Sequence, residues 1–452
     1  MLVRPAALAL ALCTSTLAVT PAIAASKVPG ARQLPITADS YPFGAADHTR
    51  IPIDLRAVGY IEEELLIAGT ANVYDWPAPG PAVVRTANVP YVTRVLIRRP
   101  RRSRAVQRHG HRGDAEPLES LRSEPGMGDL RPPGSSATAT RGSASPPSRS
   151  PSRHSRPSTP RATRRSPWRT RSRSPIRRTA TPSPPTARET ENGLVWDIHT
   201  QVGAWLRSRT ASNPLLYGAA ADAAHPVQRL YAWGYSQTGS FLYTYINAVH
   251  PLVVRDDGKS MFDAYLVAVA SGPTPINQCA PAIPAGDPRR FIRDAGVPIV
   301  RVMSQSDYLS GIAARRPDSD VAPDLYRNYE IAGSGHATPD ELNFAAAPAD
   351  IEKGGRAVPP MACNEGPRSR FPNGPAFNAI LRNLDVWVRT GTPPPHAESI
   401  LVQDGKPVLD RFGNVIGGIR SPFVEAPTST WFGNSTGPSF CRIRGTRGAV
   451  RS

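Results

Sequence analysis

The sequence predicts an α/β fold with a mostly parallel sheet and helices on both faces. Two observations support this class. Strand-like and helical patterns alternate through the second half of the chain, which is the order expected of a parallel sheet covered by helices. In addition, residues 264–270 (AYLVAVA) are apolar throughout, as strands in the interior of parallel sheets are.

The N-terminal part of this fold reads as β-rich. Residues 26–50 are loop-like, and from Ile51 the pattern becomes strand-like. Residues 60–76 alternate and are rich in β-forming residues, with Gly69 and Asn72 as the expected turn points. A further strand is expected at 91–97 (YVTRVLI). Residues 25–100 are therefore assigned to one β-rich part of the domain.

Residues 191–452 carry the α/β alternation and a β-rich tail. The apolar residues of two segments recur at helical spacing, at 194–206 and 377–387, and the second helix is expected to stop at Gly391 and Pro393. A third helix is expected at 241–249. The remaining expected strands are 227–233, 297–303 and 326–332, followed by a hairpin at 410–419.

The basic charge of the chain is concentrated in one segment. The protein has 452 residues, 54 Lys and Arg against 36 Asp and Glu, and a formal net charge of +18. Residues 101–190 contain 20 Arg, no Lys, 6 acidic residues, 16 Ser and 14 Pro, so +14 of the charge lies there. Such a low-complexity segment cannot bury a core and is predicted to be disordered.

An Arg-rich segment also raises the alternative of a protein that binds nucleic acid or another anionic polymer. Trp168 is the only aromatic residue in the segment, and no zinc-ligand spacing or recognised binding motif accompanies it. We therefore expect no specific nucleic-acid partner.

Residues 1–24 are typical of a secretory signal peptide. Arg4 provides the positive end, residues 6–19 form a short apolar stretch, and Ala22-Ile23-Ala24 fits a cleavage site. Elsewhere no apolar run reaches the roughly 18 residues of a membrane span. The sequence thus predicts a secreted or periplasmic protein without a stable membrane span.

An exported protein can form disulfides, and three cysteines follow the signal segment. Cys279 and Cys363 both lie in loops rich in Pro, Gly and Asn, which favours a bridge between them. Three unpaired thiols are the alternative, and the odd count calls for an explanation.

The segment RLYAWGYSQTG at 229–239 predicts a nucleophile. A strand runs into a tight turn at Ser236, and a helix follows at once. Such a turn needs small neighbours, and Gly234 supplies one; the second position usually carries Gly but here is Thr238, with Gly239 next to it. The turn would also direct the Gln237 N–H toward a developing oxyanion. The alternative is a serine that caps a helix.

An acid and a base follow in the order nucleophile, acid, base. Asp307 lies just beyond the strand in VPIVRVMSQSD, with Asp318 and Asp320 as weaker alternatives and a simple turn residue as another.

His336 ends the segment YRNYEIAGSGH, in a Gly-rich loop after a strand. An imidazole there could take the serine proton and return it to the leaving group. His225 and His250 are too close to Ser236 in sequence to be preferred. The catalytic residues expected are therefore Ser236, Asp307 and His336, with Gln237 as an oxyanion donor.

These segments resemble the secreted bacterial "alpha/beta hydrolase domain" family. The matching residues are YIEEELLIAGTANVYDW from Tyr60, AWGYSQTG from Ala232, YEIAGSGHA from Tyr329 and DRFGNVIGGIRSPFVEAP from Asp410, and the resemblance covers about 51–100 and 191–440. The resemblance implies hydrolysis of a carboxylic ester, and the substrate expected is a small-molecule or polymeric ester. It places the family's Ser, acid and His on Ser236, Asp307 and His336. No cofactor and no metal site is expected.

Residues 101–190 interrupt this fold where early core strands and a second oxyanion donor are expected. The abundance of Arg without Lys fits a GC-rich gene that is translated in the wrong reading frame. Codons can be chosen that encode residues 101–117 as written and that, when read one base later, encode ADPARFSGTVIVEMLNP, a strand-like sequence. We hypothesise a double frameshift, in which the correct reading frame is lost near residues 99–101 and regained near residues 186–191. If the segment is genuine as written, the chain would be a catalytically impaired hydrolase-like protein.

Overall fold

The computed structural model describes residues 27–38, 40–101, 191–216, 227–355, 357–358, 363–437, 441 and 445–449, together with the backbone of residues 118–122 and 137–142. The signal segment 1–24 lies outside these residues. Among the described helices, none is both long and apolar enough to cross a membrane.

The described strands form one large sheet and two small ones. The large sheet has ten strands in the order β1-β2-β3-β5-β4-β6-β7-β8-β10-β9. Its strands are β1 (Gly30–Leu34), β2 (Tyr60–Asp75), β3 (Val83–Pro100), β4 (Leu118–Arg122), β5 (Ala137–Gly142), β6 (Tyr231–Tyr235), β7 (Ala264–Ala268), β8 (Ile299–Ser304), β9 (Ser319–Val321) and β10 (Asp324–Ile331). The small pairs are β11 (Val402–Gln403) with β12 (Lys406–Pro407), and β13 (Thr430–Phe432) with β14 (Thr446–Gly448).

Six α-helices and several short helical turns are described in the structure. The described α-helices are α2 (Val195–Arg207), α3 (Gln237–Thr244), α4 (Tyr308–Gly311), α5 (Pro348–Lys353), α6 (Gly374–Thr390) and α7 (Pro422–Glu425). A π-helical turn, η4 (Tyr245–Val249), continues α3, and the 3₁₀ turns are η1 (Ala46–His48), η5 (His250–Leu252), η6 (Pro288–Arg290), η7 (Ile312–Ala314) and η8 (Glu341–Phe344).

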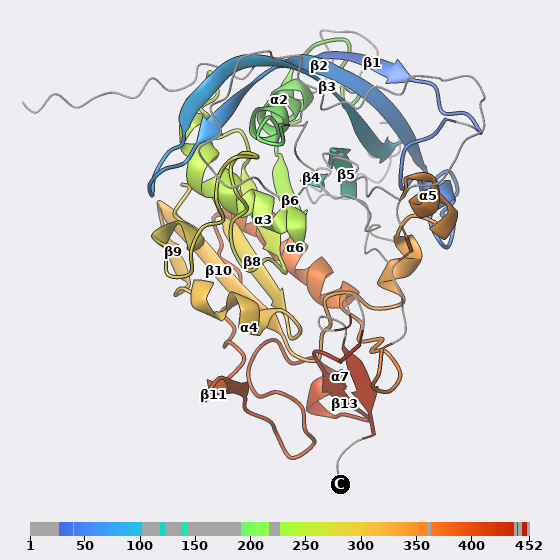
Figure 1. Cartoon of the computed structure of the whole chain (residues 1–452), viewed down its shortest axis with the longest axis vertical. Helices are drawn as coiled ribbons and strands as arrows, with labels where there is room; N and C mark the ends of the chain where they lie inside the picture. Colours follow the sequence, from blue (N-terminus) through green and yellow to red (C-terminus); the bar gives the residue numbers. More distant parts are fainter. Residues whose placement is uncertain are drawn as a thin grey trace, which may run out of the picture.

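The large sheet is mixed, whereas the sequence predicted a mostly parallel one. Neighbouring strands are parallel from β5 through β4, β6, β7 and β8 to β10, and antiparallel at both ends of the described sheet. The difference arises at the N-terminal end, where β2 and β3 form a long antiparallel pair that curves across the top of the molecule (Figure 1).

Gly69 and Asn72 do not turn the chain, which corrects the prediction from composition. Strand β2 runs through both residues. A Cβ at Gly69 would lie 2.9 Å from Gln201 Oε1, so the glycine permits close packing of the strand. Asn72 lies at a shift of register, and its N–H donates to Asp197 Oδ2 over 2.7 Å, which ties β2 to α2. A β-bulge kinks a strand without ending it.

Helices cover both faces of the sheet, as the alternation predicted. Along β7, Tyr265 and Val267 join one buried apolar cluster, and Leu266 and Ala268 join the other. Helices α2 and α3 contribute to the first cluster and α6 to the second. Helix α6 ends at Gly391, which adopts a left-handed conformation.

Two stretches of the Arg/Ser/Pro segment differ from the prediction of disorder. Residues 118–122 and 137–142 form β4 and β5, which fill the sheet between β3 and β6. Backbone hydrogen bonds hold a strand in a sheet, and composition alone does not exclude them. The rest of the segment lies outside the described residues.

The C-terminal tail contains a short antiparallel turn at the expected hairpin, without assigned strands on either side. Residues 410–419 contain a tight turn in which the Asp410 N–H donates to Asn414 O, and Leu409 and Val415 form an isolated bridge. The strands of the tail are the two short pairs named above, so the tail is less regular than its Gly-rich sequence suggested.

The disulfide joins Cys363 to Cys441, not to Cys279 as predicted. The Cα atoms of Cys363 and Cys441 are 5.6 Å apart, within the range a disulfide requires. Cys279 is a free thiol, which accounts for the odd cysteine. Loop composition says nothing about which loops meet in space, and that is why the prediction chose the wrong partner.

Candidate active site

Ser236 sits on a strained turn between β6 and α3. Its backbone has φ 58° and ψ −122°, a conformation that is rare for a residue other than glycine. The Ser236 N–H donates to Ala268 O over 2.9 Å, which fixes the turn to the adjacent strand β7. Backbone strain of this kind is concentrated at functional sites, so the turn makes Ser236 a candidate functional residue.

The residues around Ser236 explain why this sequence accepts the turn. A Cβ at Gly234 would lie 2.3 Å from Thr238 O, so no other residue fits without a backbone shift. A Cβ at Gly239 would meet Ala268 O at 2.8 Å. Thr238 is buried, and its hydroxyl accepts from the Tyr235 N–H over 2.9 Å and donates to the Tyr235 carbonyl. Gly239 thus provides the close helix packing, and Thr238 bridges the end of the strand.

Asp307 and His336 lie against each other at the same edge of the sheet. Asp307 follows β8 and His336 follows β10, and these strands are parallel neighbours. His336 Nδ1 is 2.9 Å from Asp307 Oδ2 and 3.0 Å from Oδ1. Asp307 is 5% exposed and His336 6%. A carboxylate only accepts hydrogen bonds, so Nδ1 is the donor, and in the neutral imidazole Nε2 then carries the lone pair.

Further hydrogen bonds join the loops that carry the acid and the base. The Gln305 N–H donates to Ser334 Oγ over 3.0 Å, and Gln305 Oε1 accepts from the Gly333 N–H over 2.6 Å. Ser306 Oγ accepts from the His336 N–H over 3.1 Å. Ser304 Oγ donates to Asp307 Oδ2. The relative position of Asp307 and His336 is therefore set by their backbones as well as by their side chains.

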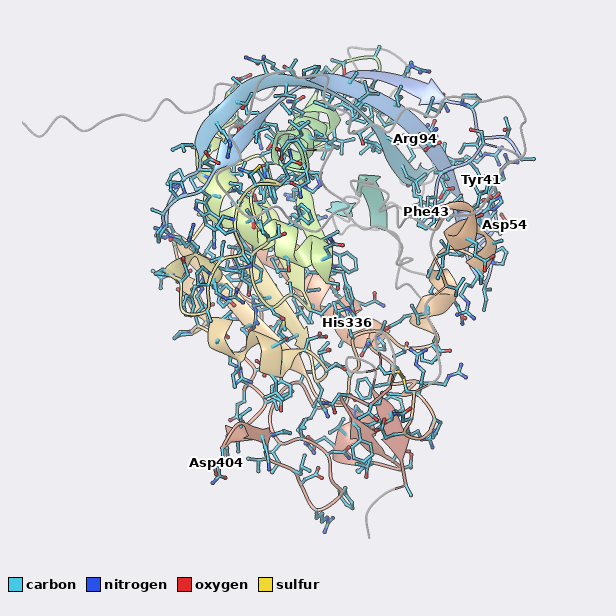
Figure 2. All side chains as sticks on the ribbon, viewed as in Figure 1. Tyr41, Phe43, Asp54, Arg94, His336 and Asp404 are labelled. Carbon is cyan, nitrogen blue, oxygen red and sulfur yellow. A yellow bond between two sulfur atoms is a disulfide. The ribbon has the colours of Figure 1, made fainter. Side chains whose placement is uncertain are left out.

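Tyr235 links the nucleophile turn to the histidine loop. Its hydroxyl donates to the His336 carbonyl, and its ring meets the imidazole edge-on with centroids 5.6 Å apart. Because Tyr235 precedes Ser236, this contact brings the serine turn and the His336 loop together. Figure 2 shows His336 near the middle of the view. In the sequence, Tyr235 reads as an ordinary strand residue, and nothing local indicates its contact with His336.

The alternative acids and bases have other partners. Asp318 and Asp320 both pair with the buried Arg327 and with His396. His250 is buried between Tyr265 Oη, 2.7 Å from its Nδ1, and Ala295 O, 2.8 Å from its Nε2. His225 lies outside the described residues. Only Asp307, of the three candidate acids, contacts His336.

Gln237 is the first residue of α3, so its N–H lies in the first turn of the helix, beside Ser236. The residue is exposed. The first N–H groups of a helix have no partner within it and attract negative charge. The connection that follows β3, within the segment where the sequence predicts the second donor, lies outside the described residues.

Glu341 was missed by the sequence analysis although it lies next to the histidine loop. Its Oε2 accepts from the Thr338 N–H over 2.7 Å, and its Oε1 accepts from Asn373 Nδ2 over 2.8 Å. Burial raises the pKa of Glu341 to about 7, and hydrogen bonds from Thr338 and Asn373 and the charge of His336 oppose this shift. The signal that could have found it is Thr338-x-x-Glu341, the pattern of a helix capping box.

The described residues contain no group of three or more His, Cys, Asp and Glu side chains that could hold a metal ion. With this geometry, Ser236 can serve as a nucleophile and His336, oriented by Asp307, can transfer protons.

Comparison with known proteins agrees with this architecture. No match is found among curated proteins. The model of the family described as "Alpha/beta hydrolase domain" matches residues 26–108 and 155–451, well over half of the chain. The protein therefore belongs to the alpha/beta hydrolase domain family and is a hydrolase by that membership.

Proposed function

We propose that the protein is a secreted serine hydrolase that cleaves carboxylic esters. The observation that carries the proposal is the buried Asp307–His336 pair at the sheet edge where the strained Ser236 turn also lies. The contact of Tyr235 with His336 supports the same arrangement, because it joins the two loops directly. Family membership supports hydrolysis but leaves the bond and the substrate open.

In the proposed reaction, Ser236 Oγ attacks the ester carbonyl while His336 Nε2 takes the hydroxyl proton. Asp307 holds the ring in the required orientation and stabilises the imidazolium that forms. The imidazolium then protonates the departing alkoxide, the alcohol leaves, and Ser236 carries the acyl group. Water, deprotonated by His336, attacks this ester and releases the acid, and the proton returns to Ser236.

The Gln237 N–H is proposed to stabilise the oxyanion of each tetrahedral intermediate. A single donor in such a site contributes on the order of 10²–10³ in rate. A second donor is proposed for the connection after β3, within the segment whose reading frame is in question. The competing proposal, a catalytically impaired hydrolase-like protein, follows if that segment is genuine as written.

Labelling with a fluorophosphonate probe tests the proposed function. We expect covalent labelling of Ser236 in the folded protein, with hydrolysis of a short-chain p-nitrophenyl ester. The variant Ser236→Ala should lose both, and Ser240→Ala, one turn further along α3, should keep both. Folded protein that remains unlabelled, or labelling that survives Ser236→Ala, would contradict the proposal.

A further inference from the structure

We propose that Glu341 and Asn373 are positioning residues that clamp the loop carrying His336, and that the charge of Glu341 promotes proton transfer to His336. The proposal deepens the hydrolase function above and rests on it. It assigns a role to a half-buried carboxyl group that the Ser236, Asp307 and His336 mechanism does not use.

Glu341 grips the loop on the C-terminal side of His336. The Thr338 N–H donates to Glu341 Oε2 over 2.7 Å, and Thr338 Oγ1 accepts from the Glu341 N–H over 3.2 Å. These reciprocal bonds have the pattern of a capping box and lie just before η8, which begins at Glu341. They fix the backbone two residues beyond His336.

Asn373 grips the loop on the other side. This residue precedes α6 and is 2% exposed. Its Nδ2 donates to Gly335 O over 3.3 Å and to Glu341 Oε1 over 2.8 Å. Its Oδ1 has no hydrogen-bond partner among the described residues, so the amide is held through its donor end. The carboxylate of Glu341 is thus the acceptor that keeps Asn373 aligned with the loop.

The other charged groups near this clamp are already paired or face solvent. Arg368 donates to the Ala337 carbonyl over 3.3 Å, and Arg370 pairs with Asp340 in an exposed ion pair. Asp307 holds Nδ1 of the imidazole. Glu341, which is bonded to Thr338 and Asn373 beside the His336 loop, adds a second negative charge near His336, and this charge favours the protonated ring.

The sign of the pH dependence follows from the protonation of Glu341. Because burial raises its pKa to about 7, Glu341 is neutral at lower pH and charged at higher pH. The charged form accepts more strongly from Thr338 and Asn373 and stabilises the imidazolium produced when His336 takes the Ser236 proton. Turnover should consequently rise as Glu341 ionises, in addition to the rise caused by loss of the His336 proton.

The variant Glu341→Gln removes this charge while keeping the shape of the side chain. Above neutral pH we expect kcat for a p-nitrophenyl ester to fall by roughly 3- to 10-fold with KM little changed. The matched control Asp340→Asn removes an exposed neighbouring charge and should behave as wild type. An NMR titration of the His336 ring should give a lower apparent pKa in Glu341→Gln than in wild type.

Failure of the clamp and failure of the proposed function give different results. Active Glu341→Gln with a wild-type pH profile and an unchanged His336 titration would overturn the clamp and leave the hydrolase intact. Wild type that does not label at Ser236 would overturn the function, while the His336 titration would still test the clamp. If Glu341→Gln does not fold, the NMR titration of the wild-type protein tests the proposal. The clamp predicts that the His336 signal shows a second inflection where Glu341 ionises, and a single inflection would contradict it.

Discussion

At the scale of single residues, hydrogen-bond partners separate residues that look equivalent in sequence. Three aspartates follow β8 within a short stretch, yet Asp307 alone meets His336, whereas Asp318 and Asp320 pair with Arg327. A carboxylate that binds a buried guanidinium is not available to orient an imidazole. The partner of each aspartate therefore gives Asp307 the position of the acid in the proposed triad.

Replacement of Asp307 by Asn tests that role. The amide can still occupy the site but favours the wrong tautomer of His336, so we expect kcat for ester hydrolysis to fall by on the order of 10⁴. The matched control is Asp324→Asn, which removes a carboxylate that pairs with Arg316 away from His336. Ester hydrolysis by purified, folded variants measures the effect, and near wild-type activity of Asp307→Asn would exclude Asp307 as the orienting acid.

At the scale of elements, the strand–turn–helix unit from β6 to α3 concentrates the strain of the site. Ser236 has a positive φ, and its neighbours leave no space for larger side chains. The hydroxyl of Thr238 and the N–H of Ser236 hold the turn through hydrogen bonds to Tyr235 and Ala268. The surrounding packing thus imposes a conformation that an isolated peptide would avoid.

The variant Gly234→Ala should disturb this unit directly. Its Cβ would lie 2.3 Å from Thr238 O, so the backbone must move, and we expect a loss of about 1–3 kcal/mol in the free energy of unfolding together with reduced labelling of Ser236. Gly374→Ala is the control, since a Cβ there meets nothing within 4 Å. Urea unfolding of the two variants should differ clearly, and equal stability would show that the turn tolerates a side chain.

At the scale of the whole molecule, β4 and β5 connect the N-terminal β-rich part to the rest of the sheet. They lie between β3 and β6, so continuity of the described sheet depends on them. Interior parallel strands are normally apolar, yet these strands have the sequences LESLR and ATATRG. The family match leaves out residues 109–154, the stretch that contains both strands, but it includes residues 101–108 and 155–190 of the same segment. Position and sequence are thus in conflict here.

This conflict at β4 and β5 favours the proposed frameshift within residues 109–154, whereas the family match to residues 155–190 counts against it there. Sequencing the gene from independent isolates should reveal a base lost or gained near the codons for 99–101 and a compensating change near 186–191. The corrected frame should encode apolar strands at these positions. An uninterrupted frame in several isolates would refute the frameshift and would favour the impaired hydrolase-like protein instead.

The sequence alone determined the features that depend on neighbours along the chain. The alternation of strands and helices, the glycines around Ser236 and the order of Ser236, Asp307 and His336 were all legible, because periodicity and turn chemistry are local. The clear local error was at Gly69 and Asn72, where close packing on α2 and a bulge resemble turn signals.

Tertiary structure decided everything that depends on which distant segments meet. It placed Asp307 against His336, paired Cys363 with Cys441, joined Tyr235 to the histidine loop and brought Asn373 to Glu341. None of these contacts leaves a periodic trace in the chain. The contacts of His336 with Asp307 and Tyr235 arise because parallel strands bring their carboxyl ends to one edge of the sheet, and the loops that gather there come from segments far apart in sequence.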